Sequence, residues 1–334
     1  MRASPLTEWA LAHLATFDPL AELRATREGC GLYDAGGRDR VLVVGAGRVG
    51  FLQGLCTNDV DALSEGHALE AAFVTAQGKL VADARVVKLE DGLLLDAEPG
   101  RGAALDELWT RHRVHEDAQW LDVSESLSAL ELWGPRAAAV LEGDPLADGE
   151  GRAASLAGAS FAALGSPFGA VLYLPADAAI RVAEALLVRG ARVVGEATRE
   201  ARRIGLGLGR YGLDWDQTHN PLEAGLERAI SYRKGCYVGQ EVVAKATYVG
   251  HVNRRLVRLE WEEEPVAPGT ALLGARTPGR VTSAAWDPLS SRTVALGMVR
   301  REVAAAGSRL RVGTEAGPEA TVVGVPFGSR PVSG

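Results

Sequence analysis

The sequence predicts a mixed α+β fold that ends in a small β-barrel. Twice between residues 71 and 194 the chain follows the order hairpin, helix, strand, which is typical of ferredoxin-like α+β units. After residue 250, short apolar strands alternate with turns rich in Pro, Gly and Ser, a pattern typical of a β-barrel. The length of 334 residues allows two or three domains, and 47% hydrophobic with 24% charged residues excludes a disordered chain.

The first part of the chain contains a glycine-rich segment that needs a choice between two interpretations. The N-terminal twenty residues are predicted to be helical, and an apolar run at 41–44 leads into Gly45-Ala46-Gly47-Arg48-Val49-Gly50. G-x-G-x-x-G after a strand is the dinucleotide fingerprint, and it would make the chain an NAD-binding oxidoreductase if parallel strand–helix units followed. Three strand-like runs with tight turns follow instead, at 71–76, 80–89 and 93–95. We therefore expect an antiparallel meander, with residues 45–50 forming a turn that enters a helix.

The later elements are predicted from hydrophobic periodicity and turn residues. Leu105, Leu108 and Trp109 form the apolar stripe of a helix over 101–113. Asn220 and Glu223 form a capping pattern around Pro221, which predicts a helix that starts there. The other predicted elements are a strand at about 127–133, a hairpin at 159–164 and 169–174, a helix at 176–189, a strand at 191–194 and five barrel strands beyond residue 250.

Composition and charge narrow the function classes. The net charge of −7 gives no support to bulk electrostatic binding of nucleic acid, and no apolar run is long enough to span a bilayer. The N-terminus lacks the layout of a secretory signal, so we expect a cytoplasmic protein without a membrane segment. Cys30, Cys56 and Cys236 are far apart and odd in number, which argues against a disulfide framework and against a cysteine-based zinc site.

The segment from Arg233 to Glu241 concentrates reactive chemistry. It contains a cation pair, a thiol, an aromatic ring, two glycines and a Gln-Glu pair. Lys234 and Arg233 beside Cys236 would favour its thiolate, the form that acts as a nucleophile and a metal ligand. The alternative is that Cys236 is a small buried hydrophobic residue in a strand. Both interpretations are open on spacing alone.

Several motifs in fixed order resemble a known family. Lys234-Gly235-Cys236-Tyr237-Val238-Gly239-Gln240-Glu241 is similar, without a gap, to the signature of the YgfZ branch of the glycine-cleavage T-protein (GcvT-like) family, whose members include mitochondrial iron–sulfur assembly factors. Weaker similarities run through the chain in the same order: residues 51–60 (FLQGLCTNDV), Gln77-Gly78-Lys79 followed by Asp83, Leu132-Trp133-Gly134-Pro135, residues 221–226 (PLEAGL) and residues 279–283 (GRVTS).

The resemblance implies a fold, a ligand and a domain division. The fold would be a three-domain cloverleaf around a central hole, with two ferredoxin-like α+β units and a C-terminal β-barrel. The implied domains are 1–45 plus 128–240, 46–127, and the barrel 241–334. The implied cofactor is tetrahydrofolate or a derivative, whose pterin needs a carboxylate and whose glutamate tail needs cations.

The resemblance also implies roles for individual residues. Asp83 is the expected pterin carboxylate, at a position where the family has a pair of acids and this chain has Ala82 in place of the first. Lys79, Arg203 and Lys245 are the expected cations for the tail. Cys236 and Lys234 are the expected reactive pair, and no metal ligands are expected. The remaining expected cofactor-binding residues are Thr57, Asn58, Gln77, Tyr237, Gln240 and Glu241.

One departure from the family bears on the reaction. Aminomethyltransferases carry an R-T-G-Y-T-G-E segment, whereas residues 161–168 (FAALGSPF) lack both its arginine and its glutamate. The sequence therefore predicts a folate-binding protein for iron–sulfur cluster assembly or repair, including support of tRNA-modifying enzymes. The alternative is a folate-dependent aminomethyltransferase or demethylase. A basic, aromatic strip over 233–255 could bind RNA or a folate polyglutamate, or it could be a plain barrel edge, and we expect a monomer.

Overall fold

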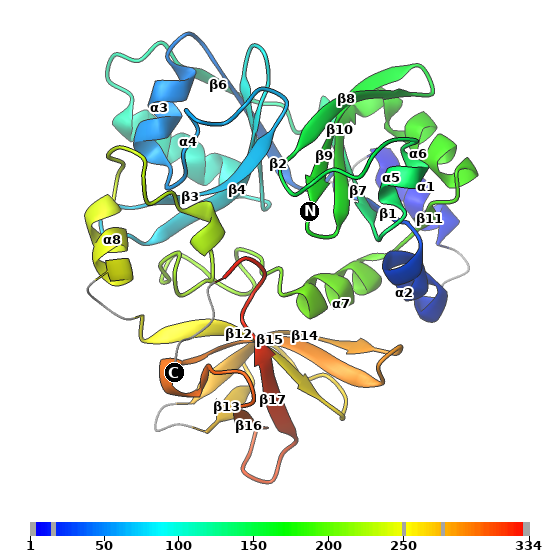
Figure 1. The fold of residues 1–334 in the computed structure, drawn as a ribbon, viewed down its shortest axis with the longest axis vertical. Coiled ribbons are helices and arrows are strands. Elements are labelled where there is room, and N and C mark those ends of the chain that lie inside the picture. The colour runs from blue at the N-terminus through cyan, green and yellow to red at the C-terminus, as the bar shows by residue number, and fades with distance from the viewer. Residues whose placement is uncertain (1–4, 15–17, 249–251, 275–277, 330–334) are drawn as a thin grey trace. The chain divides into compact units, whose positions relative to one another are not determined.

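A computed structural model describes residues 5–14, 18–248, 252–274 and 278–329, and its α+β elements end in a closed β-barrel (Figure 1). The predicted fold class is confirmed. The chain divides into two compact units. One consists of Met1–Ala71 and Ala82–Arg199, and the other of Ala72–Val81 and Glu200–Gly334.

A six-stranded sheet forms one half of the first unit. Its strand order is β11-β1-β7-β10-β9-β8, and β1 pairs in parallel with β11 while the other pairs are antiparallel. The predicted hairpin of β9 and β10 and the strand β7 are confirmed. The strands are β1 (Gly31–Asp34), β7 (Leu127–Trp133), β8 (Gly151–Leu156), β9 (Ala159–Ser166), β10 (Gly169–Pro175) and β11 (Arg192–Val193).

Helices and an apolar core stabilise this sheet. Leu6, Leu132, Leu172 and Leu186 are almost fully buried in one hydrophobic cluster that joins helices to strands. Asp18 accepts hydrogen bonds from the backbone N–H groups of Leu20 and Ala21, so it caps the following helix. The helices are α1 (Pro5–His13), α2 (Pro19–Glu28), α5 (Ala137–Val140), the 3₁₀ turn η1 (Ala176–Ala178) and α6 (Ala179–Val188).

A five-stranded sheet contains the predicted meander. Its order is β3-β4-β5-β2-β6, and β5 pairs antiparallel with both β4 and β2. Phe51 and Trp109 meet edge to face with ring centroids 6.3 Å apart, and Trp120 stacks on Phe51. The elements are β2 (Asp39–Val44), α3 (Arg48–Leu55), β3 (Ala68–Val74), β4 (Leu80–Lys88), β5 (Leu93–Ala97), α4 (Arg101–His112) and β6 (Gln119–Asp122).

The glycine-rich segment before α3 is a packed turn. Gly45 has a φ of +102°, and a Cβ there would lie 2.3 Å from the carbonyl oxygen of Asp117. The N–H of Gly47 donates to that same oxygen, and the N–H of Ala46 donates to the Asp117 carboxylate. Two of the N–H groups that a dinucleotide phosphate would need are thus already bonded, and β2 has antiparallel neighbours. The turn interpretation is confirmed.

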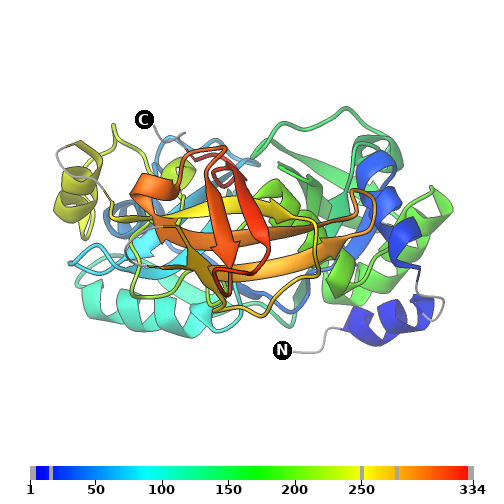
Figure 2. The same ribbon diagram turned by 90° about the horizontal axis from the view of Figure 1, so that it is seen from below.

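The second unit contains the barrel, whose strands run from yellow to red in Figure 2. The strands close in the order β12-β15-β14-β13-β16-β17 around an apolar interior that includes Leu259, Trp261 and Val281. The five predicted strands are present, and β13 is an additional short one. The elements are β12 (Arg254–Trp261), β13 (Ala271–Leu273), β14 (Gly279–Asp287), β15 (Arg292–Arg300), the 3₁₀ turn η3 (Arg301–Val303), β16 (Arg309–Val312) and β17 (Glu319–Gly324).

The prediction of a helix that starts at Asn220 is wrong. Its capping bonds do form, because the N–H of Glu223 donates to Asn220 Oδ1 and the N–H of Asn220 donates to Glu223 Oε2. The chain then turns at Gly225, whose φ is +75°, and only the 3₁₀ turn η2 (Glu227–Ala229) follows. Two real helices of this region are missing from the sequence prediction: α7 (Glu196–Leu206) and α8 (Gln240–Tyr248).

Candidate functional site

The second unit brings two sequence motifs together that are about 160 residues apart. The Gln77-Gly78-Lys79 turn is closed by the N–H of Gly78, which donates to the Thr75 carbonyl at 2.8 Å. Gly78 has a φ of +69°, and a Cβ there would lie 2.9 Å from Val242 Cγ1 of α8. The backbone of the turn and the first turns of α8 are therefore in direct contact.

Gly239, directly before α8, makes the matching contact from the other side. Its φ is +78°, and a Cβ would lie 2.4 Å from the carbonyl oxygen of Thr75. Only glycine fits at both positions, since each needs a left-handed backbone and each lacks room for a side chain. The glycines of the two motifs thus serve one shared interface within this unit.

The turn at residues 216–219 holds the lysine of the first motif. Lys79 Nζ donates to the Thr218 carbonyl at 2.6 Å, and the N–H of Leu80 donates to the His219 carbonyl at 2.9 Å. Gln77 is exposed at the tip of its turn. Of the two side chains, Gln77 reaches solvent and Lys79 is anchored by one of its three donors.

The thiol of Cys236 lies at the surface. Cys236 is exposed, whereas its neighbours Lys234 and Tyr237 are 8% and 9% exposed. The Lys234 ammonium lies over the Tyr237 ring, 5.2 Å from its centroid, and Tyr237 packs into an apolar cluster with Val74 and Leu80. The interpretation of Cys236 as a buried residue in a strand is wrong. The motif fixes a loop from which the sulfur points to solvent.

The end of the motif starts α8. The N–H of Gln240 donates to the Tyr237 carbonyl at 3.2 Å, which ties the helix start to the thiol loop. Glu241 and Lys245 are exposed on this helix. Of the proposed RNA-binding strip, the Tyr237 ring is buried, and the Tyr248 side chain and His251 lie outside the described residues. A buried ring offers no face to a base.

Three of the residues expected to bind the cofactor lie in the first unit, and their surroundings differ from one another. Thr57 is fully buried, and Asn58 Nδ2 donates to the Glu70 carbonyl at 2.7 Å while its Oδ1 accepts from the N–H of Asp59. Asp83 is half-buried on β4. The amide of Asn58 is therefore used in shaping its own loop.

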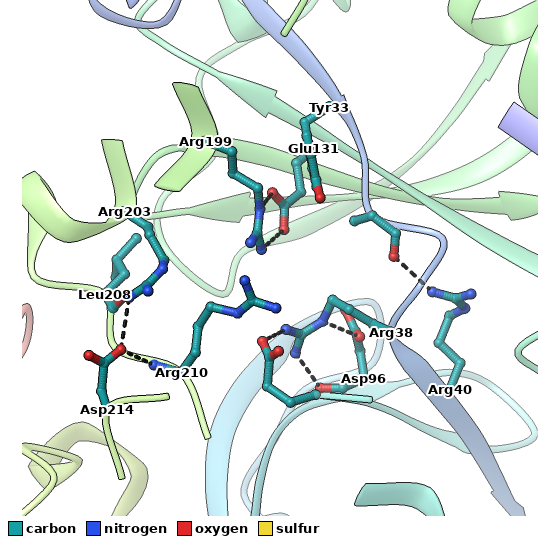
Figure 3. A network of polar contacts seen from close by, with 12 residues as sticks. Tyr33, Arg38, Arg40, Asp96, Glu131, Arg199, Arg203, Leu208, Arg210 and Asp214 are labelled. Carbon is teal, nitrogen blue, oxygen red and sulfur yellow. Dashed lines mark hydrogen bonds and ion pairs between the residues drawn. The ribbon is translucent and has the colours of Figure 1, made fainter. Parts of the chain in front are cut away.

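Arg203 of α7 is saturated by hydrogen bonds within the second unit, and Figure 3 shows the one to Asp214. Its five N–H groups donate to the carboxylate of Glu200, to Asp214, to the Leu208 carbonyl and to Ser283. Asp214, which is fully buried, also accepts from the hydroxyls of Thr282 and Ser283. This arrangement explains the Thr282-Ser283 pair of the barrel motif, and it leaves Arg203 no donor for a ligand.

A buried ion pair in the first unit was not expected from the sequence (Figure 3). Arg199 donates from Nε to Glu131 at 2.9 Å, and the Trp133 indole N–H donates to the same carboxylate. The Arg199 guanidinium also lies 4.8 Å from the centroid of the Tyr33 ring, and the Tyr33 hydroxyl donates to Glu196. Burial alone would raise the pKa of Glu131, but Arg199 holds it below its ordinary value.

A second buried cluster in this unit centres on Asp96. Arg38 donates to Asp96 at 2.7 Å and also pairs with Glu98, and the Tyr173 hydroxyl donates to Asp96 at 2.6 Å. Burial and the Asp96 charge raise the pKa of Tyr173 far above its ordinary value, so its proton stays in place. A charged residue inside an otherwise apolar strand is the sequence signal for such buried clusters. Glu131 in LSALELW and Asp96 in LLLDA are the two examples.

Within the described residues no helix is long and apolar enough to cross a membrane.

Two family models match this chain, and both describe parts of one protein. Residues 14–150 match the GCVT N-terminal domain, and residues 254–327 match the glycine cleavage T-protein C-terminal barrel domain. The chain belongs to the GcvT-like superfamily. The assignment to the YgfZ branch stays a prediction.

Individual relatives of this superfamily cover nearly the whole chain. An aminomethyltransferase of Thermosynechococcus vestitus is 28% identical over 99% of this chain and 93% of its own. An aminomethyltransferase of Thermotoga petrophila is 29% identical over 92% of this chain and 88% of its own. The crystal structure of the glycine cleavage system aminomethyltransferase T from Bartonella henselae has a TM-score of 0.85 over 100% of this chain and 99% of that one, at 23% identity. At that identity the structural likeness speaks for the fold alone.

Proposed function

We propose that this protein binds tetrahydrofolate and performs one-carbon transfer of the aminomethyltransferase type. The observation that carries the proposal is the contact of the Gln77–Lys79 turn with Gly239 and α8. This contact holds Lys79 and Lys245, the lysine of α8, on one packed part of the second unit. Superfamily membership and relatives named aminomethyltransferase over nearly the whole chain support the class of reaction.

The hydrogen bonds of the three expected tail-binding cations favour two of them. Lys79 keeps two of its three N–H donors after the bond to Thr218, and Lys245 is exposed on α8. Arg203 is not retained as a tail-binding cation, because all five of its N–H donors have acceptors inside the protein. We therefore propose Lys79 and Lys245 for the anionic glutamate tail. Asp83 stays the pterin carboxylate that the family resemblance implies.

A transfer assay tests the reaction. The protein is incubated with tetrahydrofolate and either an aminomethyl-lipoyl carrier, which releases ammonia and the reduced lipoyl thiol, or a methylated amine together with an added two-electron oxidant that converts it to the iminium. Methylene-tetrahydrofolate is measured. We expect product with one of these donors, and Lys79→Gln should raise the KM for a folate polyglutamate by about tenfold, as loss of one charged contact predicts. Lys88→Gln is the matched control, because Lys88 lies on β4 outside the motifs. A lack of product with every donor would exclude the enzymatic proposal.

A second candidate function is favoured by the exposed thiol. Cys236 presents its sulfur to solvent within the segment that resembles the YgfZ signature, and residues 161–168 lack the arginine and glutamate of aminomethyltransferases. This candidate is a folate-binding factor for iron–sulfur cluster assembly or repair in the cytoplasm, serving clients that include tRNA-modifying enzymes. The three-domain division and the monomeric state belong to the same proposal.

Complementation separates the two candidates. In a strain lacking this gene, Cys236→Ala should abolish the recovery of iron–sulfur enzyme activity while folate affinity stays normal. Cys56→Ala, which removes a buried thiol, serves as the control. Full recovery with Cys236→Ala would remove the thiol from the mechanism and leave the transfer reaction as the remaining proposal.

A further inference from the structure

The first unit contains a cavity of about 220 Å³ beside β11, the edge strand of the six-stranded sheet. Three polar side chains line it: His13 of α1, Glu22 of α2 and Arg192 of β11. The rest of the lining is apolar and consists of Leu14, Leu187, Ala191 and Val193. None of these residues belongs to the folate motifs.

Glu22 is the buried anchor of this cavity. Its side chain is about 2% exposed, and Oε2 accepts from the N–H of Gly195 at 2.9 Å and from Thr198 Oγ1 at 2.7 Å. Through Oε2 the carboxylate therefore caps the start of α7, where N–H groups would otherwise lack acceptors. Oε1 accepts no hydrogen bond within the described part of the chain. Glu22 also lines the cavity, so its carboxylate has one oxygen left for a ligand there.

The rim has the opposite charge. Arg192 is exposed, and its guanidinium forms no ion pair within the described residues. His13 Nδ1 is bonded to the Trp9 carbonyl at 2.8 Å and its ring lies against the Trp9 ring, so Nε2 is its open edge. The Glu22 carboxylate, the Arg192 cation and apolar walls define a site that recognises two opposite charges joined by a short aliphatic body.

We propose that this cavity binds a small aliphatic amino acid, with its ammonium group on Glu22 and its carboxylate on Arg192. A charged hydrogen bond to a buried carboxylate is strong, and a guanidinium matches a carboxylate with two parallel donors. The volume of about 220 Å³ suits a ligand smaller than the drug-sized molecules of larger pockets. This inference is independent of the proposed folate function.

Calorimetric titration of the full chain with L-valine tests the proposal. We expect binding of one valine per chain, and binding at least about tenfold weaker for isobutylamine, which lacks the carboxylate, and for 3-methylbutanoate, which lacks the ammonium group. Glu22→Gln keeps an oxygen to cap α7 and turns an N–H toward the cavity, so valine binding should fall by at least about tenfold. Arg192→Gln should weaken the binding of valine and leave the affinity for isobutylamine unchanged. Arg181→Gln, an exposed arginine of α6 outside the lining, is the control.

Two further measurements keep the test decisive. Thermal unfolding shows whether Glu22→Gln is folded, and Leu187→Trp, which fills the cavity from its wall, should abolish binding without touching the α7 cap. Failure of wild-type protein to bind valine at millimolar concentration would overturn the proposal. Equal binding of valine and both single-charge analogues, or undiminished binding by Leu187→Trp, would overturn it as well.

Discussion

The three cysteines have different surroundings, and only Cys236 is exposed. Burial raises the pKa of Cys30 to about 12, against a weaker opposing effect of the Arg136 charge, so this thiol stays protonated at neutral pH. Cys56 is fully buried and donates from Sγ to the Asn58 carbonyl at 3.3 Å. Reactivity follows thiolate content and access, so the native protein should have one reactive thiol.

A thiol titration checks this prediction. With an aromatic disulfide reagent, we expect one equivalent to react in the native protein and all three after denaturation. Cys236→Ser should remove the native reaction, whereas Cys30→Ser should leave it unchanged. Rapid reaction of two or more thiols in the native state would show that the described burial is wrong.

The Glu131–Arg199 ion pair makes a contribution to the stability of the fold that depends on pH. Because the pKa of Glu131 is lower in the folded chain than its ordinary value of 4.5, the pair stabilises the fold above that pH. This stabilisation is lost as the pH falls below about 4.5 and through the folded-state pKa. Removing the carboxylate charge also leaves the Arg199 cation buried without its partner, which costs roughly 3–5 kcal/mol.

Urea unfolding at several pH values measures the effect. Glu131→Gln should lower the free energy of unfolding by roughly 3–5 kcal/mol at neutral pH and lose less than wild type between about pH 6 and about pH 3. Glu142→Gln is the control, since the Glu142 side chain is 67% exposed in its ion pair with Arg189 and exposed pairs contribute at most about 1 kcal/mol. Parallel acid curves for wild type and Glu131→Gln would contradict the assignment.

At the scale of elements, the contact between the Gln77–Lys79 turn and α8 determines where the motif residues lie. Gly239 needs a positive φ and has no room for a Cβ, whereas Gly235, four residues earlier, has open space around it. Gly239→Ala should therefore destabilise the protein by about 1–3 kcal/mol and weaken folate binding. Gly235→Ala should change either quantity little.

Thermal unfolding and folate titration of the two glycine variants test this interface. Because both substitutions add the same methyl group within one motif, the difference between them reports the packing against Thr75. Equal behaviour of the two variants would show that the turn and α8 do not depend on their contact.

The helices and strands also show which parts of the fold could be predicted from the sequence. Periodicity predicted α4, the β9–β10 hairpin and the barrel strands, because each buries a regular apolar face. It failed at Asn220, where the capping bonds form but Gly225 ends the turn, since a local signal for a helix start does not specify its continuation. It also missed α7, whose buried residues include Thr198, Arg199 and Arg203. A helix that buries arginines lacks the apolar stripe on which the prediction depends.

At the scale of the whole molecule, the order of the family motifs predicted the fold class, while the buried charge pairs stayed hidden. The partners Glu131 and Arg199 are 68 residues apart, and Arg203 and Ser283 are 80 residues apart. Nothing in one sequence states that two distant charges neutralise each other. The resemblance therefore assigned Arg203 to the ligand, and the structure uses it to join α7 to β14 within the second unit.

Calorimetric titration with folinic acid, comparing wild type, Asp83→Ala and Lys88→Gln, is the most direct test of the folate proposal. We expect one binding site in wild type and in Lys88→Gln. Asp83→Ala should bind about tenfold more weakly or worse, because a hydrogen bond to a charged group contributes roughly 1.5–3 kcal/mol. No binding by the wild-type protein, or equal affinity for all three forms, would contradict it.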